Sequence, residues 1–249
     1  MRWRVAGDGP PLVLLHGLAA SSHWWSAVLP RLSERYACHL LDVPRFGAAL
    51  HPDETAEWVG AWMDAARLER VRLVGHSIGG AAAARLSALR PELVEALALV
   101  SPAGMPSGRR PAGYALPLLA AVRMATPGFL VRLSVDALRA GPAAIVRGGL
   151  YAARADVREQ ARAIQAPTLL LWGDRDPLVP FALADEWRRA LPSARLVVLP
   201  GVGHVPMVER PQPVVEALRE FLDQPGDLAG GRPVGGVRRS ADDLEPPGR

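Results

Sequence analysis

Val71-Arg72-Leu73-Val74-Gly75-His76-Ser77-Ile78-Gly79-Gly80 is an apolar, strand-like run that ends abruptly in Gly-His-Ser-Ile-Gly. An alanine-rich helical pattern over 81–89 follows at once. Strand, sharp turn and helix in this order are the context of a nucleophile elbow. We therefore predict that Ser77 lies in a strained turn, with small Gly75 and Gly79 letting strand and helix approach closely. The alternative is an ordinary strand-to-helix turn that happens to contain a serine.

The composition excludes several classes of protein. The chain has 249 residues, 49% of them hydrophobic and 22% charged, which is typical of a globular protein with one large or two small domains. It contains no lysine, so lysine Schiff-base and P-loop chemistry are excluded. Cys38 is the only cysteine, which excludes internal disulfides and cysteine-rich metal sites. The mild net charge of +4 gives no reason to expect a nucleic-acid partner.

The chain begins Met1-Arg2-Trp3-Arg4 without a long apolar segment, so we predict no signal peptide. Its longest apolar runs are broken by Pro, Gly or Arg well short of a membrane span. We therefore expect a cytoplasmic protein with no membrane-spanning segment.

Short apolar runs alternate with helical patterns along most of the chain, which predicts an α/β fold with a mostly parallel sheet and helices on both faces. The expected strands are 2–6, 12–15, 37–41, 71–74, 96–100, 168–172 and 196–199. The expected helices are 24–32, 55–66, 81–89, 183–191 and 213–222.

The alternation stops between the expected strands 96–100 and 168–172. Residues 101–165 are helix-like, are interrupted by prolines and contain no convincing strand, so we predict a helical lid inserted into a core formed by 1–100 and 166–223. Residues 224–249 are rich in Gly and Pro and poor in large apolar residues, and we predict a disordered tail there.

Two further loops carry residues that could activate Ser77. The strand ending at Trp172 leads into Gly173-Asp174-Arg175-Asp176, and the strand ending at Leu199 leads into a glycine-rich loop with His204. A serine needs a base and an orienting acid to act as a nucleophile. Open α/β sheets place such residues at the carboxyl ends of their strands. The chain order Ser77, Asp176, His204 is that of the α/β-hydrolase triad.

With these motifs and with His16-Gly17 after the strand at 12–15, the chain resembles the α/β-hydrolase superfamily over about residues 2–223. The resemblance implies that His204 is the general base and that Asp176 orients it. Two alternatives stay open: Asp174 is the orienting acid and Asp176 caps the following helix, or His204 is a surface-loop histidine. The resemblance also implies that the backbone N–H groups of Leu18 and Ile78 form the oxyanion hole.

The expected lid carries most of the positive charge. Residues 101–166 contain nine arginines against three acids. Arg147, Arg154, Arg158 and Arg162 have the spacing of one stripe along a single helix. The stripe is either a solvated face or a surface that steers an anionic or carrier-linked substrate to the cleft.

We expect the substrate pocket to include Trp25, Phe46, Tyr114, Phe129 and Val205, although aromatic residues near an elbow more often only pack in the core. No cluster of ligands accompanies the histidines, so no metal and no cofactor are expected.

These inferences predict a cofactor-free serine hydrolase that cleaves a small carboxylic ester or thioester through an acyl-Ser77 intermediate. One alternative uses the same triad to hydrolyse a carbon–carbon bond of a diketone acid or to transfer an acyl group. Another is a ligand-binding protein of this fold with little turnover.

Overall fold

The computed structural model describes residues 2–43, 52–106, 108, 116–117, 120–121 and 127–223. Within them a seven-stranded sheet has the order β1-β3-β2-β4-β5-β6-β7. All neighbouring strands are parallel except the edge pair of β1 and β3, which is antiparallel. The strands are β1 (Arg2–Ala6), β2 (Pro11–Leu15), β3 (Ala37–Asp42), β4 (Val71–His76), β5 (Val94–Val100), β6 (Thr168–Gly173) and β7 (Arg195–Leu199).

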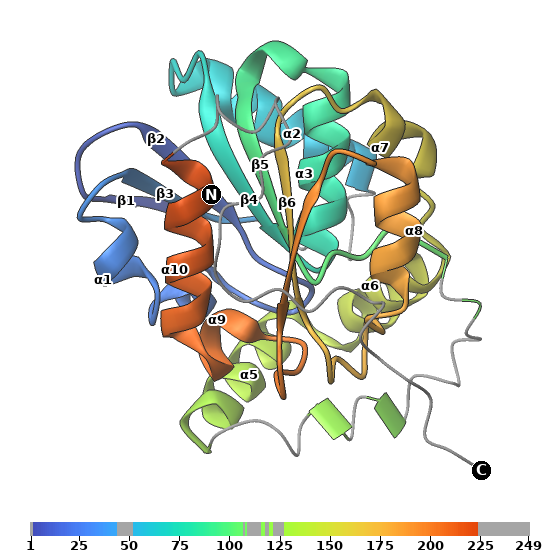
Figure 1. The fold of residues 1–249 in the computed structure, drawn as a ribbon. Coiled ribbons are helices and arrows are strands. Elements are labelled where there is room, and N and C mark those ends of the chain that lie inside the picture. Colours follow the sequence, from blue (N-terminus) through green and yellow to red (C-terminus); the bar gives the residue numbers. More distant parts are fainter. Residues whose placement is uncertain are drawn as a thin grey trace.

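Helices cover both faces of this sheet, so the predicted α/β architecture is confirmed (Figure 1). On one face lie η1 (Ser22–Trp25), α1 (Leu29–Leu32), α9 (Pro206–Glu209) and α10 (Pro211–Leu222). On the other lie α2 (Pro52–Ala65), α3 (Ile78–Leu89), α7 (Arg158–Ala163) and α8 (Leu183–Ala190). A short turn, η2 (Pro91–Leu93), joins α3 to β5.

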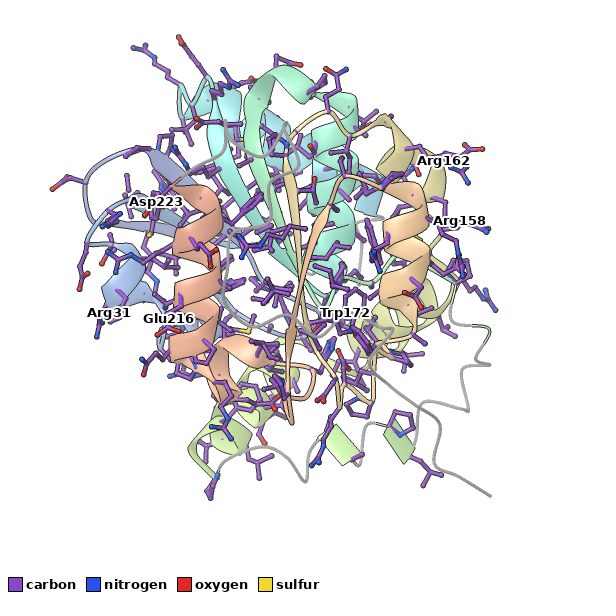
Figure 2. All side chains as sticks on the ribbon, viewed as in Figure 1. Arg31, Arg158, Arg162, Trp172, Glu216 and Asp223 are labelled. Carbon is purple, nitrogen blue, oxygen red and sulfur yellow. The ribbon has the colours of Figure 1, made fainter. Side chains whose placement is uncertain are left out.

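The central strands read as unbroken apolar runs because both of their faces are buried. Residues 12–15 of β2 and 169–172 of β6 have no exposed surface. Their side chains alternate between two apolar clusters, one on each side of the sheet. Trp172 in β6 lies inside the molecule among these side chains (Figure 2). The sheet is thus a rigid support for the loops at its carboxyl edge.

The junction of β4 and α3 is packed without room for side chains. A Cβ atom at Gly75 would lie 2.7 Å from Cα of Gly80 and 2.8 Å from Cβ of Ala83. One at Gly79 would lie 2.9 Å from the carbonyl oxygen of Leu15. These glycines let α3 pack directly against β2 and β4, as the sequence predicted for 75 and 79.

The segment between β5 and β6 contains α5 (Pro127–Ala140), α6 (Pro142–Arg154) and α7 among its described residues. Helices α5 and α6 lie beyond one end of the sheet (Figure 1). In contrast, α7 packs between α3 and α8, and Ala161 belongs to the core cluster on that face. The predicted tail, 224–249, lies outside the described residues.

The four arginines predicted to form a stripe on one helix do not lie on a single helix, because the chain leaves the helical conformation at 155–157. Arg147 and Arg154 therefore lie on α6, and Arg158 and Arg162 lie on α7. Arg158 bonds to the Asp156 carboxylate, and both Arg158 and Arg162 project outward from the body of the protein (Figure 2). For the two arginines of α7, this arrangement fits the first of the two alternatives, a solvated face.

One expected helix was wrong in detail, and one short helix was not predicted. The helix expected at 24–32 is two short pieces, η1 and α1, because Pro30 lacks an N–H and its ring clashes with the preceding turn of a continuous helix. The sequence analysis also missed α9, a single turn directly after the His204 loop. Among the described residues, no helix combines the length and apolar character that crossing a membrane requires.

We predict that Gly75→Ala lowers the free energy of unfolding by about 2 kcal/mol, because the new methyl group overlaps backbone atoms of α3. Gly149→Ala is the control: it lies inside α6, where a Cβ atom would meet open space, and it should raise that free energy by about 0.5 kcal/mol. Urea unfolding of both variants measures the difference. Equal effects would contradict the close-packing argument.

Candidate active site

Ser77 stands at the turn between β4 and α3 with φ 55° and ψ −121°, a conformation that L residues rarely adopt. The backbone around it holds this conformation: its N–H donates to the carbonyl of Val100, and its carbonyl accepts from Gly80 and Ala103. The side chain is almost buried, with 9% of the residue exposed. A strained residue fixed by its surroundings is typical of a functional position.

The structure brings Ser77, His204 and Asp176 into one hydrogen-bonded line. Nε2 of His204 lies 3.0 Å from Oγ of Ser77, and Nδ1 of His204 lies 2.7 Å from Oδ2 of Asp176. An ionised carboxylate only accepts hydrogen bonds, so the Nδ1–H of His204 donates to Asp176. Nε2 then carries a lone pair that faces the serine hydroxyl, which is the tautomer that a general base requires.

Asp176 is fixed by bonds to its other oxygen. Its Oδ1 accepts from the backbone N–H groups of Leu178 and Val179, at 2.9 Å each. Asp174 lies elsewhere: its Oδ1 accepts from the N–H of Gly201 at 2.6 Å and so ties the loop after β6 to the loop after β7. Of the two acids left open by the sequence, the structure places Asp176 beside His204.

Two residues without a predicted role hold the His204 loop. Glu209 accepts from the N–H groups of Gly203, at 2.7 Å, and Val205, at 3.0 Å. On the other side of the loop, Nε2 of His76 lies 2.8 Å from the carbonyl oxygen of His204 and donates its proton to it. Glu209 lies only a few residues after His204, so the sequence could have indicated that it fixes this loop, whereas the His76 contact spans 128 residues and has no local signal.

Burial keeps His76 neutral. Its pKa is well below the usual 6.5, first because burial penalises the charged form and second because His204 lies close by. The centroids of the two rings are 4.9 Å apart. The ring next to His204 is therefore an uncharged imidazole and not a second imidazolium that would repel a positive charge there.

The loop after β2 passes directly over the elbow. A Cβ atom at Gly17 would lie 3.2 Å from Cβ of Ser77 and 3.0 Å from Nδ1 of His76. Nδ1–H of His16 donates to the carbonyl of Gly17 at 2.8 Å, and its Nε2 accepts from the N–H of Val43 at 3.1 Å. Carbonyl and N–H of one trans peptide point in opposite directions, so the N–H of Leu18 points away from His16.

Two features suit this region to an anionic oxygen. Ile78 is the first residue of α3, and the first N–H groups of a helix have no acceptor within the helix. The partial positive charge of a helix N-terminus adds to the attraction. His16 stays neutral because burial lowers its pKa, so it contributes a fixed geometry rather than a charge.

The predicted pocket residues fall into three groups. Phe46 and Tyr114 lie outside the described residues. Phe129 on α5 packs edge-on against Trp24, with ring centroids 5.0 Å apart, and Val205 follows His204 directly. Trp25 is fully buried in an apolar cluster, and its neighbour Trp24 is the residue whose ring approaches His76, at 6.0 Å.

Among the residues that the structure describes, no group of three or more His, Cys, Asp or Glu side chains could hold a metal ion. The single cysteine, Cys38, is buried, and burial raises the pKa of its thiol to about 12.

Comparison with known proteins gives a consistent family. A family model described as "Alpha/beta hydrolase family" matches residues 12–217. A pimeloyl-[acyl-carrier protein] methyl ester esterase of Aeromonas hydrophila is 30% identical over 246 residues, covering 87% of this chain and 96% of the relative. The protein of the same name from Nitrosomonas europaea is 32% identical over 243 residues, covering 85% and 95%.

Solved structures show the same architecture. A bacterial membrane phospholipase A matches with a TM-score of 0.75 and 29% identity, covering 92% of this chain and 83% of that one. A structure described as a putative lipase from Acinetobacter baumannii matches with a TM-score of 0.76 and 25% identity, covering 89% and 87%.

The low pKa of His76 predicts a pH dependence of stability. Below pH 6.5 the unfolded chain binds a proton at this histidine that the folded protein does not bind, so the free energy of unfolding falls as the pH falls. Between pH 7.5 and pH 5.5 this one group should account for about 1 kcal/mol. In His76→Gln that contribution disappears, and urea unfolding at the two pH values should give a smaller decrease. An unchanged decrease would show that His76 is protonated in the folded protein.

Proposed function

The chain belongs to the alpha/beta hydrolase family, and within this family we propose that it is a serine ester hydrolase that works through an acyl-Ser77 intermediate. The observation that carries the proposal is the line of two hydrogen bonds from Ser77 to His204 and from His204 to Asp176. Neither packing nor ligand binding requires this arrangement of hydroxyl, imidazole and carboxylate. The relatives named as methyl ester esterases support the same chemistry.

In the proposed reaction, Oγ of Ser77 attacks the carbonyl carbon of the ester while its proton passes to Nε2 of His204. Asp176 stabilises the imidazolium that forms. The tetrahedral intermediate collapses, His204 returns the proton to the leaving alcohol, and an acyl-serine remains. Water, activated by the same histidine, then releases the acid and restores Ser77.

The negative oxygen of each tetrahedral intermediate needs fixed donors. We assign this role to the backbone N–H groups of Leu18 and Ile78. The His16–Gly17 bond supports the first assignment because it fixes the orientation of the peptide that carries the Leu18 N–H. The position of Ile78 at the start of α3 supports the second.

The relatives' name indicates a methyl ester on an acyl chain held by a carrier protein, and we propose a carrier-linked ester of this kind as the substrate class. The arginine-rich segment 101–165 would act as the lid over the acyl chain. Carbon–carbon hydrolysis and acyl transfer use the same residues and become the alternatives if esters are not cleaved. The cytoplasmic location expected from the sequence is part of this proposal.

The test is initial-rate hydrolysis of p-nitrophenyl butyrate and of the monomethyl ester of a dicarboxylic acid by the wild type and by Ser77→Ala. We expect saturable hydrolysis by the wild type and a loss of kcat of at least about 10³-fold in the variant. Equal rates for the two proteins would contradict the proposal and would favour carbon–carbon cleavage, acyl transfer or binding alone.

Asp174 and Asp176 offer a matched pair for the same assay. Asp176→Asn should lower kcat by about 10³-fold or more, because the amide cannot stabilise the imidazolium and favours the wrong tautomer of His204. Asp174→Asn keeps an oxygen that can accept from Gly201 and should stay within about twofold of the wild type. The reverse pattern would make Asp174 the orienting acid.

A further inference from the structure

Helix α5 carries its only acidic residue, Asp136, on the side that faces the protein. Asp136 is 3% exposed, whereas Val131 and Leu138 on the same helix are 67% and 83% exposed. Burying a carboxylate is unfavourable unless its hydrogen bonds and charge are compensated. A helix that buries its one acid while two of its aliphatic residues are exposed does so for a specific contact.

That contact is with the core segment 21–24. Oδ2 of Asp136 accepts from the hydroxyl of Ser21 at 2.9 Å and from the indole Nε1–H of Trp24 at 3.1 Å. Its other oxygen, Oδ1, lies 3.9 Å from the guanidinium of Arg139, which is largely exposed. The two strong bonds therefore both connect α5 to one short segment that lies more than 110 residues earlier in the chain.

The same face of α5 supports this contact. Phe129 lies two helical turns before Asp136 and packs edge-on against the ring of Trp24. Leu133, between them, packs against the apolar cluster to which Trp24 belongs. Phe129, Leu133 and Asp136 thus form one stripe, at spacings of four and three residues, that docks on Trp24 and the apolar cluster around it.

The segment 21–24 is held from the core side as well. The N–H of Ser22 donates to Oδ1 of Asp42, at the end of β3, at 2.6 Å. The segment directly follows the loop that carries Leu18, and the ring of Trp24 lies 6.0 Å from that of His76. Two carboxylates, Asp42 from the core and Asp136 from α5, therefore fix the segment 21–24. This segment directly follows the loop 16–20 that carries Leu18, which we call the oxyanion loop.

We propose that Asp136 is a positioning residue: through Ser21 and Trp24 it holds the oxyanion loop in place and couples that loop to the lid helix α5. This inference rests on the proposed function, because Leu18 is assigned there as an oxyanion donor. Oxyanion donors act only in a narrow range of distance and direction, and displacements of about 1 Å reduce rates strongly. The effect of Asp136 should therefore be on kcat rather than on substrate binding.

The experiment compares the wild type, Asp136→Ala, Asp136→Asn and the control Asp156→Ala on p-nitrophenyl acetate, a substrate too small to depend on the lid. In Asp136→Ala kcat should fall about tenfold with KM nearly unchanged. Asp136→Asn should recover most of this loss, because both bonds end on one oxygen that an amide can supply. Asp156→Ala removes an exposed acid of the same insertion and should match the wild type within about twofold.

Hydrogen–deuterium exchange on the same proteins gives a readout that does not depend on turnover. Loss of the carboxylate should speed exchange in two separate segments, the loop and helix at 18–25 and helix α5 at 127–140, while β4 to β6 keep the wild-type pattern. If exchange rises in both segments but the wild type hydrolyses no ester, the coupling of α5 to the oxyanion loop is supported and only the proposed function is contradicted.

Other results would overturn the proposal. Exchange that rises in α5 alone, or kcat in Asp136→Ala within twofold of the wild type, would show that Asp136 only anchors the helix. If Asp136→Ala does not fold, Ser21→Ala removes one of the same bonds from the core side. It should lower kcat about threefold with KM unchanged, and an unchanged kcat would contradict the coupling.

Discussion

The positive φ of Ser77, where β4 passes into α3, is the constraint on which the rest of the structure depends. A serine holds this conformation only because its N–H and carbonyl are bonded to the ends of neighbouring segments. The turn also requires α3 to start directly against β2 and β4, which only glycines at 75 and 79 permit. The buried central strands supply the rigidity that keeps this strained turn from relaxing.

Around this turn, side chains from distant parts of the chain fix one another by hydrogen bonds. His204 is held through its ring by Asp176 and through its carbonyl by His76, while Glu209 holds the amides on either side of it. His16 holds the loop that passes over Ser77. The result is a site whose groups are fixed before any substrate binds, and in which burial lowers the pKa of both His16 and His76.

The sequence alone was enough to predict the fold class and the family, because both depend on local patterns. Apolar runs with both faces buried, the Gly-His-Ser-Ile-Gly turn and the loops after two later strands are all visible within a few residues. The same patterns named Ser77, Asp176 and His204, whose catalytic roles remain predictions. The Asp136–Trp24 and His76–His204 contacts could not be predicted in this way, because each joins residues more than 110 positions apart without a motif. Pro30 is visible in the sequence, and because proline disfavours an unbroken helix the helix expected at 24–32 forms as two short pieces.

Covalent labelling tests the central claim, that Ser77 is an activated nucleophile, most directly. The wild type and Ser77→Ala would be treated with an alkyl fluorophosphonate and analysed by intact-protein and peptide mass spectrometry. We predict a single adduct on Ser77 in the wild type, formed together with loss of ester hydrolysis, and no adduct in the variant. An adduct on another residue, or an unlabelled wild type that hydrolyses esters at its full rate, would contradict the account.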